Sequence, residues 1–556
     1  MLRWMLIAAC VASSGCSLLV TETTFGDGGA AGADAGSPPD AAGTDAGDRD
    51  AGEPFDAGPD ATVGLCTADS DCSDGAFCNG EERCDSGDAM ADDRGCVGAA
   101  ATACPSPMTC DEAEDRCGPV EGTFREDLGA IVADVTTDDA GNVYVVGCIF
   151  GDTSVGGPTL TVAGMRAGFV AAYEPSGAHR WSHAFGGDDT MGDVSYPNRD
   201  CATSVAVDSD GRVYVRGSVS DGMPDFGGGP VVVDSGSTGV VVAYDSFGSF
   251  QWMTPSEGSD FSGRLIVASL ADGSETVVSL TTFRGTTEIG ARMLSGDGSS
   301  DFYVARLDRL TGNVLHVEWG RGAGDDFASD AAVIGNSIYV VGGMEGGMVG
   351  TTEVATDGQD ALVARFGGSD LSVEDVIAYG GSGTDYFTTA VSAGAHLYAA
   401  GAADSSFEMA SGIEVTVVDG TDGFLADLEV ASGSLTPRWA RTMSGIGDDR
   451  VSAVVLDSDT PTRVVVGGMF QEDVDVGAGA VSSDGDFDLF TAAYSVVDGA
   501  HTWSHSFGSM GSDNYVAIDR LPTGALILGV SVFGDGASFG GSTLGSGRSH
   551  VLTLQP

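Results

Sequence analysis

The chain has 556 residues, and 82 acidic against 24 basic side chains give it a formal net charge of −58. Every basic residue is an arginine, which excludes a lysine Schiff base and a Walker-type phosphate loop, because both need a lysine amine. Nucleic acids and anionic lipid surfaces are excluded as direct partners, because proteins bind them through clustered basic side chains. The 86 glycines predict many turns and short strands in place of long helices.

Residues 1–15 have the pattern of an export signal, in which Arg3 is followed by the apolar run 4–11 and then by small residues. The run is too short to span a bilayer. Because Cys16 comes directly after a glycine, the segment resembles a bacterial lipoprotein signal, which implies lipidation of Cys16. We therefore expect attachment to a membrane through a lipid anchor, in the cell envelope and as an outer-membrane lipoprotein. The alternative is an ordinary signal that is cleaved nearby and releases a secreted protein.

Residues 16–64 begin with the lipid-anchor cysteine and are dominated by glycine, alanine, aspartate and proline, with the tripeptide Asp-Ala-Gly repeated. Such a composition cannot bury enough apolar surface to offset the entropy that ordering would cost. We predict a disordered tether that is extended by repulsion between its like charges.

Residues 65–117 predict a disulfide-rich module, because cysteines are dense and even in number in a chain with an export signal. Their pairing is left open by the sequence, and they are Cys66, Cys72, Cys78, Cys84, Cys96, Cys104, Cys110 and Cys117. A zinc site is the alternative, but the segment has neither a Cys-x-x-Cys pair nor a histidine. The spacing from Cys72 to Cys84 resembles a Cys-rich module near the start of bacterial surface lipoproteins, a module with no assigned chemistry.

From residue 118 onward one unit recurs about every 64 residues. Each copy has a turn rich in aspartate and glycine, an apolar strand that ends in glycine, as in 138–147 and 208–217, and a second apolar strand. A glycine turn then leads to a strand marked in most copies by tryptophan, at Trp181, Trp252, Trp319, Trp439 and Trp503. The apolar strands lack strict alternation, which predicts that both of their faces are covered. Four short antiparallel strands per copy, stacked against like copies, predict blades of a β-propeller.

The two ends of the repeat region complement each other. The last copy stops at residue 556 without its aromatic strand, whereas a strand at 120–124 precedes the first copy. Pairing of these two segments would complete the last blade and remove two exposed sheet edges. Residues 118–556 resemble the seven-bladed β-propeller repeat family of bacterial exported proteins. This resemblance implies an all-β fold, a seven-bladed β-propeller preceded by the small disulfide-rich module and the tether. A fainter resemblance connects the region to quinoprotein propellers, which usually have eight blades.

Histidines are a first place to look for chemistry. His183 and His505 lie two residues after a tryptophan, at a position where other copies carry Thr254 and Arg441. A position that varies in this way is expected to face solvent and to take no part in catalysis.

Glycine-rich loops that end in aspartate follow the aromatic strands. In a propeller such a loop crosses to the innermost strand of the next blade, so we expect these carboxylates to ring the central channel at one face. Acidic, oxygen-rich loops suit calcium, which gives the candidate metal ligands Asp189, Asp326, Asp385, Asp449 and Asp513. The alternative is that each aspartate accepts hydrogen bonds from its own turn.

Cys148 and Cys201 are the cysteines that remain in the repeat region, and they lie in adjacent copies. In an exported protein two such cysteines are expected to form a disulfide.

Together these features predict a non-enzymatic binding or scaffold lipoprotein of the cell envelope. We expect a monomer whose propeller binds a protein or a saccharide through one face, with no catalytic residue and with calcium as the cofactor to test. Two alternatives remain, an envelope hydrolase or lyase in which channel carboxylates act on a sugar, and an outer-membrane assembly factor. Repetition of the aspartates favours binding, because a catalyst needs one or two residues that depart from the repeat. The fold alone does not decide between these functions.

Overall fold

The computed structural model describes residues 66, 68, 72, 83–85, 96–97, 109–111, 116–118, 120–125 and 128–555, apart from 163, 187–199, 220–222, 233–237, 432, 535–536, 540–541 and 545–547. Across these residues the regular secondary structure is β-strand, so the expected all-β class is confirmed. None of the described segments forms a helix long and apolar enough to cross a membrane. The signal, Cys16 and the tether lie outside the described residues.

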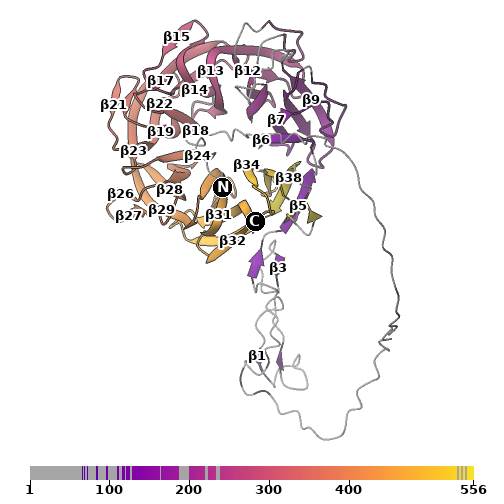
Figure 1. Ribbon diagram of the computed structural model, residues 1–556, viewed down its shortest axis with the longest axis vertical. Helices are drawn as coiled ribbons and strands as arrows, with labels where there is room; N and C mark the ends of the chain where they lie inside the picture. Colours follow the sequence, from indigo (N-terminus) through magenta and orange to yellow (C-terminus); the bar gives the residue numbers. More distant parts are fainter. Residues whose placement is uncertain are drawn as a thin grey trace, which may run out of the picture. The chain divides into compact units, whose positions relative to one another are not determined.

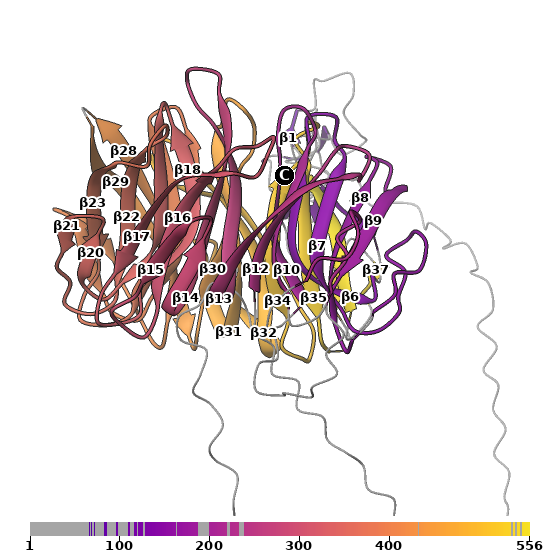
Figure 2. The same cartoon turned by 90° about the horizontal axis from the view of Figure 1, so that it is seen from above.

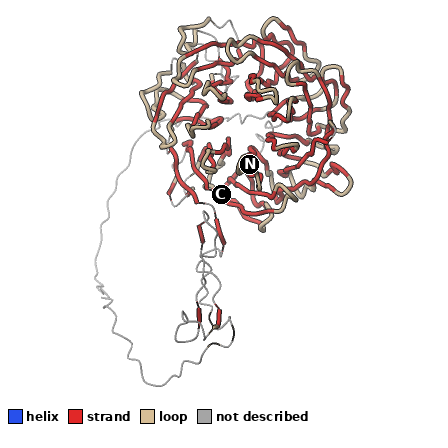
Figure 3. The backbone as a smooth tube through the Cα atoms, turned by 180° about the vertical axis from the view of Figure 1, so that it is seen from behind, coloured by secondary structure: helices blue, strands red, loops and turns tan. Residues whose placement is uncertain are grey.

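The strands of the larger unit pair into antiparallel sets of four, which we name by their first strands (Figures 1 and 3). The sets are the β6 set of β6 (Ala130–Thr137), β7 (Val143–Ile149), β8 (Ala167–Tyr173) and β9 (His179–Phe185); the β10 set of β10 (Cys201–Val207), β11 (Val213–Val219), β12 (Thr238–Tyr244) and the first part of β13 (Phe250–Ser269); the β13 set of the last part of β13, β14 (Glu275–Ile289), β16 (Asp301–Leu307) and β17 (Val314–Arg321); the β18 set of β18 (Phe327–Ile334), β19 (Ser337–Met344), β22 (Asp360–Gly367) and β23 (Val373–Tyr379); the β24 set of β24 (Asp385–Ala393), β25 (His396–Ala403), β28 (Asp422–Ala431) and β29 (Ser434–Ile446); the β30 set of β30 (Arg450–Leu456), β31 (Arg463–Asp475), β32 (Ala480–Ser495) and β33 (His501–Phe507); and the β34 set of β34 (Asn514–Arg520), β35 (Leu526–Val532), β38 (Arg548–Gln555) and β5 (Val120–Arg125).

The first strands of neighbouring sets lie against one another around a common centre. Contacts run in order from β6 through β10, β13, β18, β24 and β30 to β34, and β34 in turn contacts β6. Figure 1 shows the labelled first strands β6, β18, β24 and β34 on the inside of the ring, and Figure 2 shows the ring from its side. The larger unit is therefore propeller-like, as the repeat predicts.

The predicted pairing of the two ends is present. Strand β5 pairs antiparallel with β38, with Leu552 opposite Thr123 and Leu554 opposite Glu121. Because β5 comes from the start of the repeat region and β38 from its end, this pairing completes the β34 set and covers an edge that would otherwise be open.

Short strands extend the connections between the main strands. They are β15 (Arg292–Ser295), β20 (Gly347–Val349), β21 (Thr352–Val354), β26 (Phe407–Ala410), β27 (Ile413–Val415), β36 (Ser538–Phe539) and β37 (Ser542–Thr543). Each belongs to a connection from a second to a third strand of a set.

The hydrophobic core lies between neighbouring sets. Strands β8, β11, β12 and β35 are buried at every residue, which matches the continuous apolar runs of the sequence. One cluster joins Tyr144 and Val146 of the β6 set to Val213 and Val215 of the β10 set. Each set thus buries its middle strands against the sets beside it, and isolated sets would lose this burial.

The Cys-rich segment contributes to a second compact unit, which contains Cys66, Cys72, Cys84 and Cys96. Its described strands are β1 (Arg83–Cys84) and β2 (Cys96–Val97), and its disulfides join Cys66 to Cys84 and Cys72 to Cys96. The Sγ atoms of Cys66, Cys72 and Cys84 lie within 4.8 Å of one another. Because each of these sulfurs is in a disulfide, none is a thiolate for zinc.

The remaining cysteines of the segment are described in part or not at all. Strands β3 (Thr109–Asp111) and β4 (Arg116–Gly118) group with the larger unit and place the Cα atoms of Cys110 and Cys117 opposite each other. The side chains of Cys110 and Cys117, and all of Cys78 and Cys104, lie outside what the structure describes.

Candidate functional site

The aspartates predicted as metal ligands are buried at the junctions between sets. Asp326, Asp385, Asp449 and Asp513 are each fully buried, and each opens or directly precedes the first strand of its set. Asp189 lies outside the described residues. Asp200, the residue before β10, holds the corresponding position in the β10 set and is also buried.

Asp326, Asp385, Asp449 and Asp513 each face another aspartate from the preceding set, which was not predicted from the sequence. It lies at the start of the third strand, or at the corresponding position inside β32, and it is 7% exposed or less. The resulting junction pairs are Asp301 with Asp326, Asp360 with Asp385, Asp422 with Asp449, and Asp488 with Asp513. The signal was available as Asp-Gly a few residues before each of these third-strand aspartates, as in 357–360 and 419–422.

The same backbone hydrogen bond positions the two members of every junction pair. In each pair, the amide of the aspartate at the first strand donates to the carbonyl oxygen of the residue that precedes the third-strand aspartate. The amide of Asp326 donates to Ser300 at 2.8 Å and that of Asp385 donates to Gln359 at 2.7 Å, and Asp449 and Asp513 repeat the bond to Thr421 and Phe487. This bond carries the chain from one set into the next and fixes two carboxyl groups side by side.

The pair of Asp360 and Asp385 shows how close the two carboxyl groups are. A Cβ atom placed on Gly380 would lie 2.5 Å from Oδ1 of Asp360 and 3.0 Å from Oδ2 of Asp385. The glycine therefore leaves a space into which both carboxyl groups reach. Oδ2 of Asp385 accepts hydrogen bonds from the amide of Gly381 and from the hydroxyl of Ser405, but Oδ1 of Asp360 is buried with no hydrogen-bond donor.

The pair of Asp301 and Asp326 repeats this arrangement around Gly322. The Gly322 amide donates to Oδ1 of Asp301 at 3.0 Å, and a Cβ atom on the same glycine would lie 2.5 Å from Oδ2 of Asp326 and against the carbonyl oxygen of Gly346. Oδ1 of Asp326 accepts from the Glu345 amide at 2.9 Å, whereas its Oδ2 has no donor.

The pair of Asp422 and Asp449 is the least compensated. Asp422 accepts from the amide of Val418 at 2.6 Å, but neither oxygen of Asp449 makes a hydrogen bond of good geometry. Burial raises the pKa of Asp449 to about 8, and the carboxylate of Asp422 adds to this more than the Gln471 amide opposes it. Burial also raises the pKa of Asp422 to about 6.

The other junction pairs have raised pKa values from the same causes. Burial comes first and brings the pKa of Asp326 to about 7 and those of Asp360 and Asp488 to about 6, and the partner carboxylate adds to the rise in each case. In the fourth pair, Oδ1 of Asp488 and Oδ2 of Asp513 are buried without donors. Two carboxyl groups that share one dry site cannot both stay ionised unless a proton or a cation balances their charge.

The expected ring of aspartates around an open channel is therefore wrong in its placement. The loops do cross to the innermost strand of the next set, as predicted, but the carboxyl groups end inside the junctions and not on a solvated wall. The reason is the backbone hydrogen bond described above, which turns each aspartate toward the preceding set.

A different group of charges lies at the centre of the ring, on the first strands. Arg264 of β13 has Nη1 3.2 Å from Oδ1 of Asp134 and Nε 3.6 Å from Oδ1 of Asp330, and the charge of Asp519 also acts on it. Burial raises the pKa of Asp134 and of Asp519, although Arg264 lowers that of Asp134. The sequence analysis did not identify Arg264, because one arginine in an innermost strand leaves no repeated signal.

Hydrogen bonds show what these central aspartates do. Oδ2 of Asp134 accepts from the hydroxyl of Ser204 and the amide of Val205 in β10, both at 3.0 Å. Asp330 accepts in the same way from Thr389 and Ala390 of β24, and Asp519 accepts from Thr136 and Thr137 of β6. These carboxylates fasten one set to the next, and Arg264 balances two of them.

The side chain of His183 contacts the neighbouring set, so the expectation that this side chain faces solvent is wrong. Nε2 of His183 lies 2.7 Å from the carbonyl oxygen of Gly248, which belongs to a turn of the next set. Thr254 and Arg441, at the equivalent position, donate to the carbonyl oxygens of Gly312 and Gly499. The residue type varies because any hydrogen-bond donor satisfies a carbonyl.

Tryptophans complete this contact between sets. The indole of Trp181 donates to the carbonyl oxygen of Ser246 at 3.2 Å, and that of Trp252 donates to Arg309 in the same manner. Trp319 does not belong to this series. Trp181 lies opposite Ala172, the next-to-last residue of β8, and the next-to-last residue of β16 is Arg306. The residue opposite Arg306 is His316 and not Trp319.

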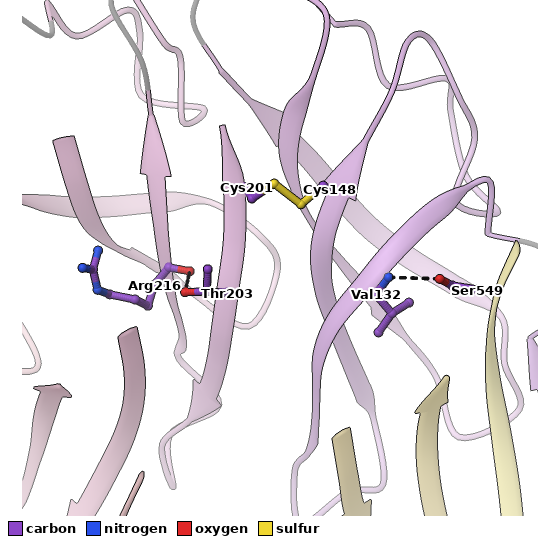
Figure 4. The surroundings of a disulfide bond; sticks show 6 residues. All are labelled: Val132, Cys148, Cys201, Thr203, Arg216 and Ser549. Atoms are coloured by element: carbon purple, nitrogen blue, oxygen red, sulfur yellow. Dashed lines mark hydrogen bonds between the residues drawn. A yellow bond between two sulfur atoms is a disulfide. The ribbon is translucent and has the colours of Figure 1, made fainter. Parts of the chain in front are cut away.

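Figure 4 shows the disulfide between Cys148 of β7 and Cys201 of β10, which the sequence predicts. The two Cα atoms are 4.8 Å apart across the junction between the β6 and β10 sets. Nearby, the amide of Val132 donates to the hydroxyl of Ser549 at 3.2 Å, and the hydroxyl of Thr203 donates to the carbonyl oxygen of Arg216 (Figure 4).

Surface hollows lie elsewhere. One, of about 450 Å³, is lined by residues 289–292 and 313–317 at the outer strands of the β13 set. Another, of about 210 Å³, lies at turns around residues 270, 336 and 367–374. Neither includes a junction pair or the central charges.

Comparisons with known proteins give distant structural similarities alone. No family model matches the chain, and no curated protein matches it. Among solved structures, the WD40 beta propeller domain of Doa1 is similar at 12% identity with a TM-score of 0.40, over 78% of this chain and 97% of that one. The Dos1 propeller is similar at 8% identity and 0.41, over 79% and 95%. Quinohemoprotein alcohol dehydrogenase from Comamonas testosteroni is similar at 10% identity and 0.34, over 78% and 76%. At these TM-scores the similarities assign no activity to the chain.

Proposed function

We propose that this protein is a non-enzymatic binding or scaffold protein of the cell envelope, whose propeller has seven blades and binds a partner protein through one face. In this proposal each four-stranded set is a blade, Cys16 carries the lipid anchor, and the chain acts as a monomer held away from the membrane by its tether. In the sequence, the small disulfide-rich module follows the tether and precedes the propeller.

The face that we propose for binding is defined by the chain's topology. In a set of antiparallel strands, the connection from the second to the third strand and the connection to the next set leave the sheet at the same end. We call this end the connection face. The two kinds of hairpin turn, between first and second and between third and fourth strands, lie at the opposite end.

Exposed apolar side chains on the connection face support this proposal. Phe150 and Met165 lie in one such connection, and the guanidinium of Arg166 lies 4.8 Å from the centre of the Phe150 ring. Met165 is 76% exposed. Other connections at this face expose Met223, Val232, Met293, Val418, Ile446 and Met510. Aromatic residues, methionine and arginine are the types enriched in protein interfaces, which favours a protein partner over a saccharide.

Site-specific crosslinking in the native host tests this proposal. A photoreactive residue is placed at Met165 on the connection face, and as a control at Phe247, which is 80% exposed in a hairpin turn at the opposite end. We expect one discrete crosslinked protein from position 165, absent from position 247 and lost when Phe150→Ser is added. Equal crosslinking from both positions would contradict the assigned face. Crosslinks to glycan alone would replace the protein partner with a saccharide.

A further inference from the structure

The junction pairs contain more negative charge than their surroundings compensate. Each pair places two carboxyl groups in a buried site, and oxygen atoms of Asp326, Asp360, Asp449, Asp488 and Asp513 have no hydrogen-bond donor there. Arg264 forms ion pairs with two of the central aspartates of the ring, but the ion pairs among the described residues bring no arginine to either member of a junction pair. An unpaired buried charge of this kind is costly unless a further group balances it.

Two observations besides the acidic residues themselves point to a ligand. Asp449 is fully buried and neither of its carboxyl oxygens makes a hydrogen bond of good geometry, although donors satisfy Asp422 beside it. At two other junctions a glycine lies between the two carboxyl groups. A Cβ atom on Gly380 would lie against oxygens of both pair members, and one on Gly322 would lie against Oδ2 of Asp326, while the Gly322 amide donates to Oδ1 of Asp301. A single turn that satisfied its own aspartate would need neither the second carboxyl group nor the glycine.

We infer that each junction pair binds one divalent cation, calcium in particular, between adjacent sets. Two carboxylates match the charge of one dication. Calcium accepts carboxylate and carbonyl oxygens in irregular geometry, and the carbonyl oxygen of Gly346 lies beside the pair of Asp301 and Asp326. Among the described residues, no junction brings a third carboxylate or histidine ligand atom within 4.8 Å of a pair, so backbone carbonyls and water would complete the coordination.

The wider surroundings attract a cation to the same places. A further aspartate lies a few residues before each third-strand aspartate, and its charge raises the pKa of that residue. These aspartates are Asp297, Asp357, Asp419 and Asp484. Clustered negative charge raises the local concentration of cations. Sites with few charged ligands in extracellular proteins bind calcium with Kd values on the order of 10⁻⁴–10⁻³ M, so millimolar calcium is the concentration to use.

This inference does not depend on the proposed partner, and direct binding of calcium tests it. Calorimetric titration of the full chain at pH 8, after treatment with chelator, measures the number of calcium ions bound. The variant Asp422→Asn with Asp449→Asn removes one junction pair, and Asp360→Asn with Asp385→Asn removes another if the first variant does not fold. Asp272→Asn with Asp370→Asn is the control, because it removes the same charge from two exposed turns.

We expect each junction variant to bind one calcium ion fewer than the natural chain, and the control to bind the same number. Calcium should raise the Tm of the natural chain, and the rise should be smaller in each junction variant. No binding at millimolar calcium would overturn the inference in favour of a shared proton in each pair. Unchanged stoichiometry in the variants would overturn it as well, because calcium would then bind the acidic tether or another segment.

Discussion

At the scale of residues, the fold places carboxyl groups where their charge is hardest to keep. Asp449 is the extreme case, because neither of its carboxyl oxygens makes a hydrogen bond of good geometry and, among the described residues, Arg450 beside it forms its ion pair with Asp448. The sequence predicts one aspartate of each junction pair from the Gly-rich loops. It did not reveal the second, because the two members come from different copies and their contact depends on a backbone bond that no spacing within one copy encodes. The central role of Arg264 could not be predicted for a different reason, because this arginine occurs in a single copy of the repeat.

The raised pKa of Asp449 predicts how stability depends on pH when cations are removed. Because its folded pKa of about 8 exceeds the ordinary value of 3.8, the folded state holds this proton over a pH range in which the unfolded state has lost it. The stabilisation is complete below pH 4 and is lost as the pH rises through 8. In chelator, Asp449→Asn should match the natural chain near pH 4, gain on it by at most about 1.4 kcal/mol per pH unit between pH 4 and pH 8, and keep a constant advantage above pH 8, so that its advantage is larger at pH 9 than at pH 5.

Chemical denaturation at pH 5 and pH 9 measures this difference in the free energy of unfolding. The control is Asp272→Asn, since hydrogen bonds from the Ser274 hydroxyl and amide lower the pKa of Asp272. That variant should gain nothing at pH 9. If Asp449→Asn differs from the natural chain by the same amount at both pH values, the carboxyl group titrates normally and the junction is not as dry as the structure indicates.

At the scale of elements, the repeat encodes how one set attaches to the next. The turn that carries Gly248 packs on the indole of Trp181, and its carbonyl groups accept hydrogen bonds from Trp181 and His183. The four-strand pattern and the closing pair β5 and β38 could be predicted because hydrophobic periodicity reports strands directly. The role of His183 could not, because a variable residue type conceals a constant contact with a backbone carbonyl.

A pair of glycine variants measures the strength of this attachment. Gly248 and Gly273 both have a φ of +82°, but a Cβ atom on Gly248 would lie 2.6 Å from the Trp181 ring, whereas one on Gly273 would have open space. Gly273→Ala should cost about 1–2 kcal/mol from backbone strain alone. Gly248→Ala should cost about 1–3 kcal/mol more, because the ring must move. Equal losses in the free energy of unfolding would show that the turn does not depend on Trp181.

At the scale of the whole molecule, the chain closes its ring with strands from both ends of the repeat region. Deletion of residues 118–125 removes β5 and leaves β38 with an unpaired edge. We expect a loss on the order of 3–5 kcal/mol, since each lost backbone hydrogen bond contributes about 1 kcal/mol, and an increased tendency to associate through the open edge. Denaturation and light scattering check both effects. A deletion variant as stable and monodisperse as the natural chain would show that β5 does not close the ring.

Anomalous X-ray scattering from crystals grown with calcium or terbium would show directly whether cations occupy the junction pairs. We expect strong anomalous peaks between Asp422 and Asp449 and between Asp360 and Asp385, with similar peaks at the other two pairs. Junctions without peaks, in crystals that show bound ions at other places, would contradict this expectation. The paired carboxyl groups would then share protons, and calcium would have no part in holding the sets together.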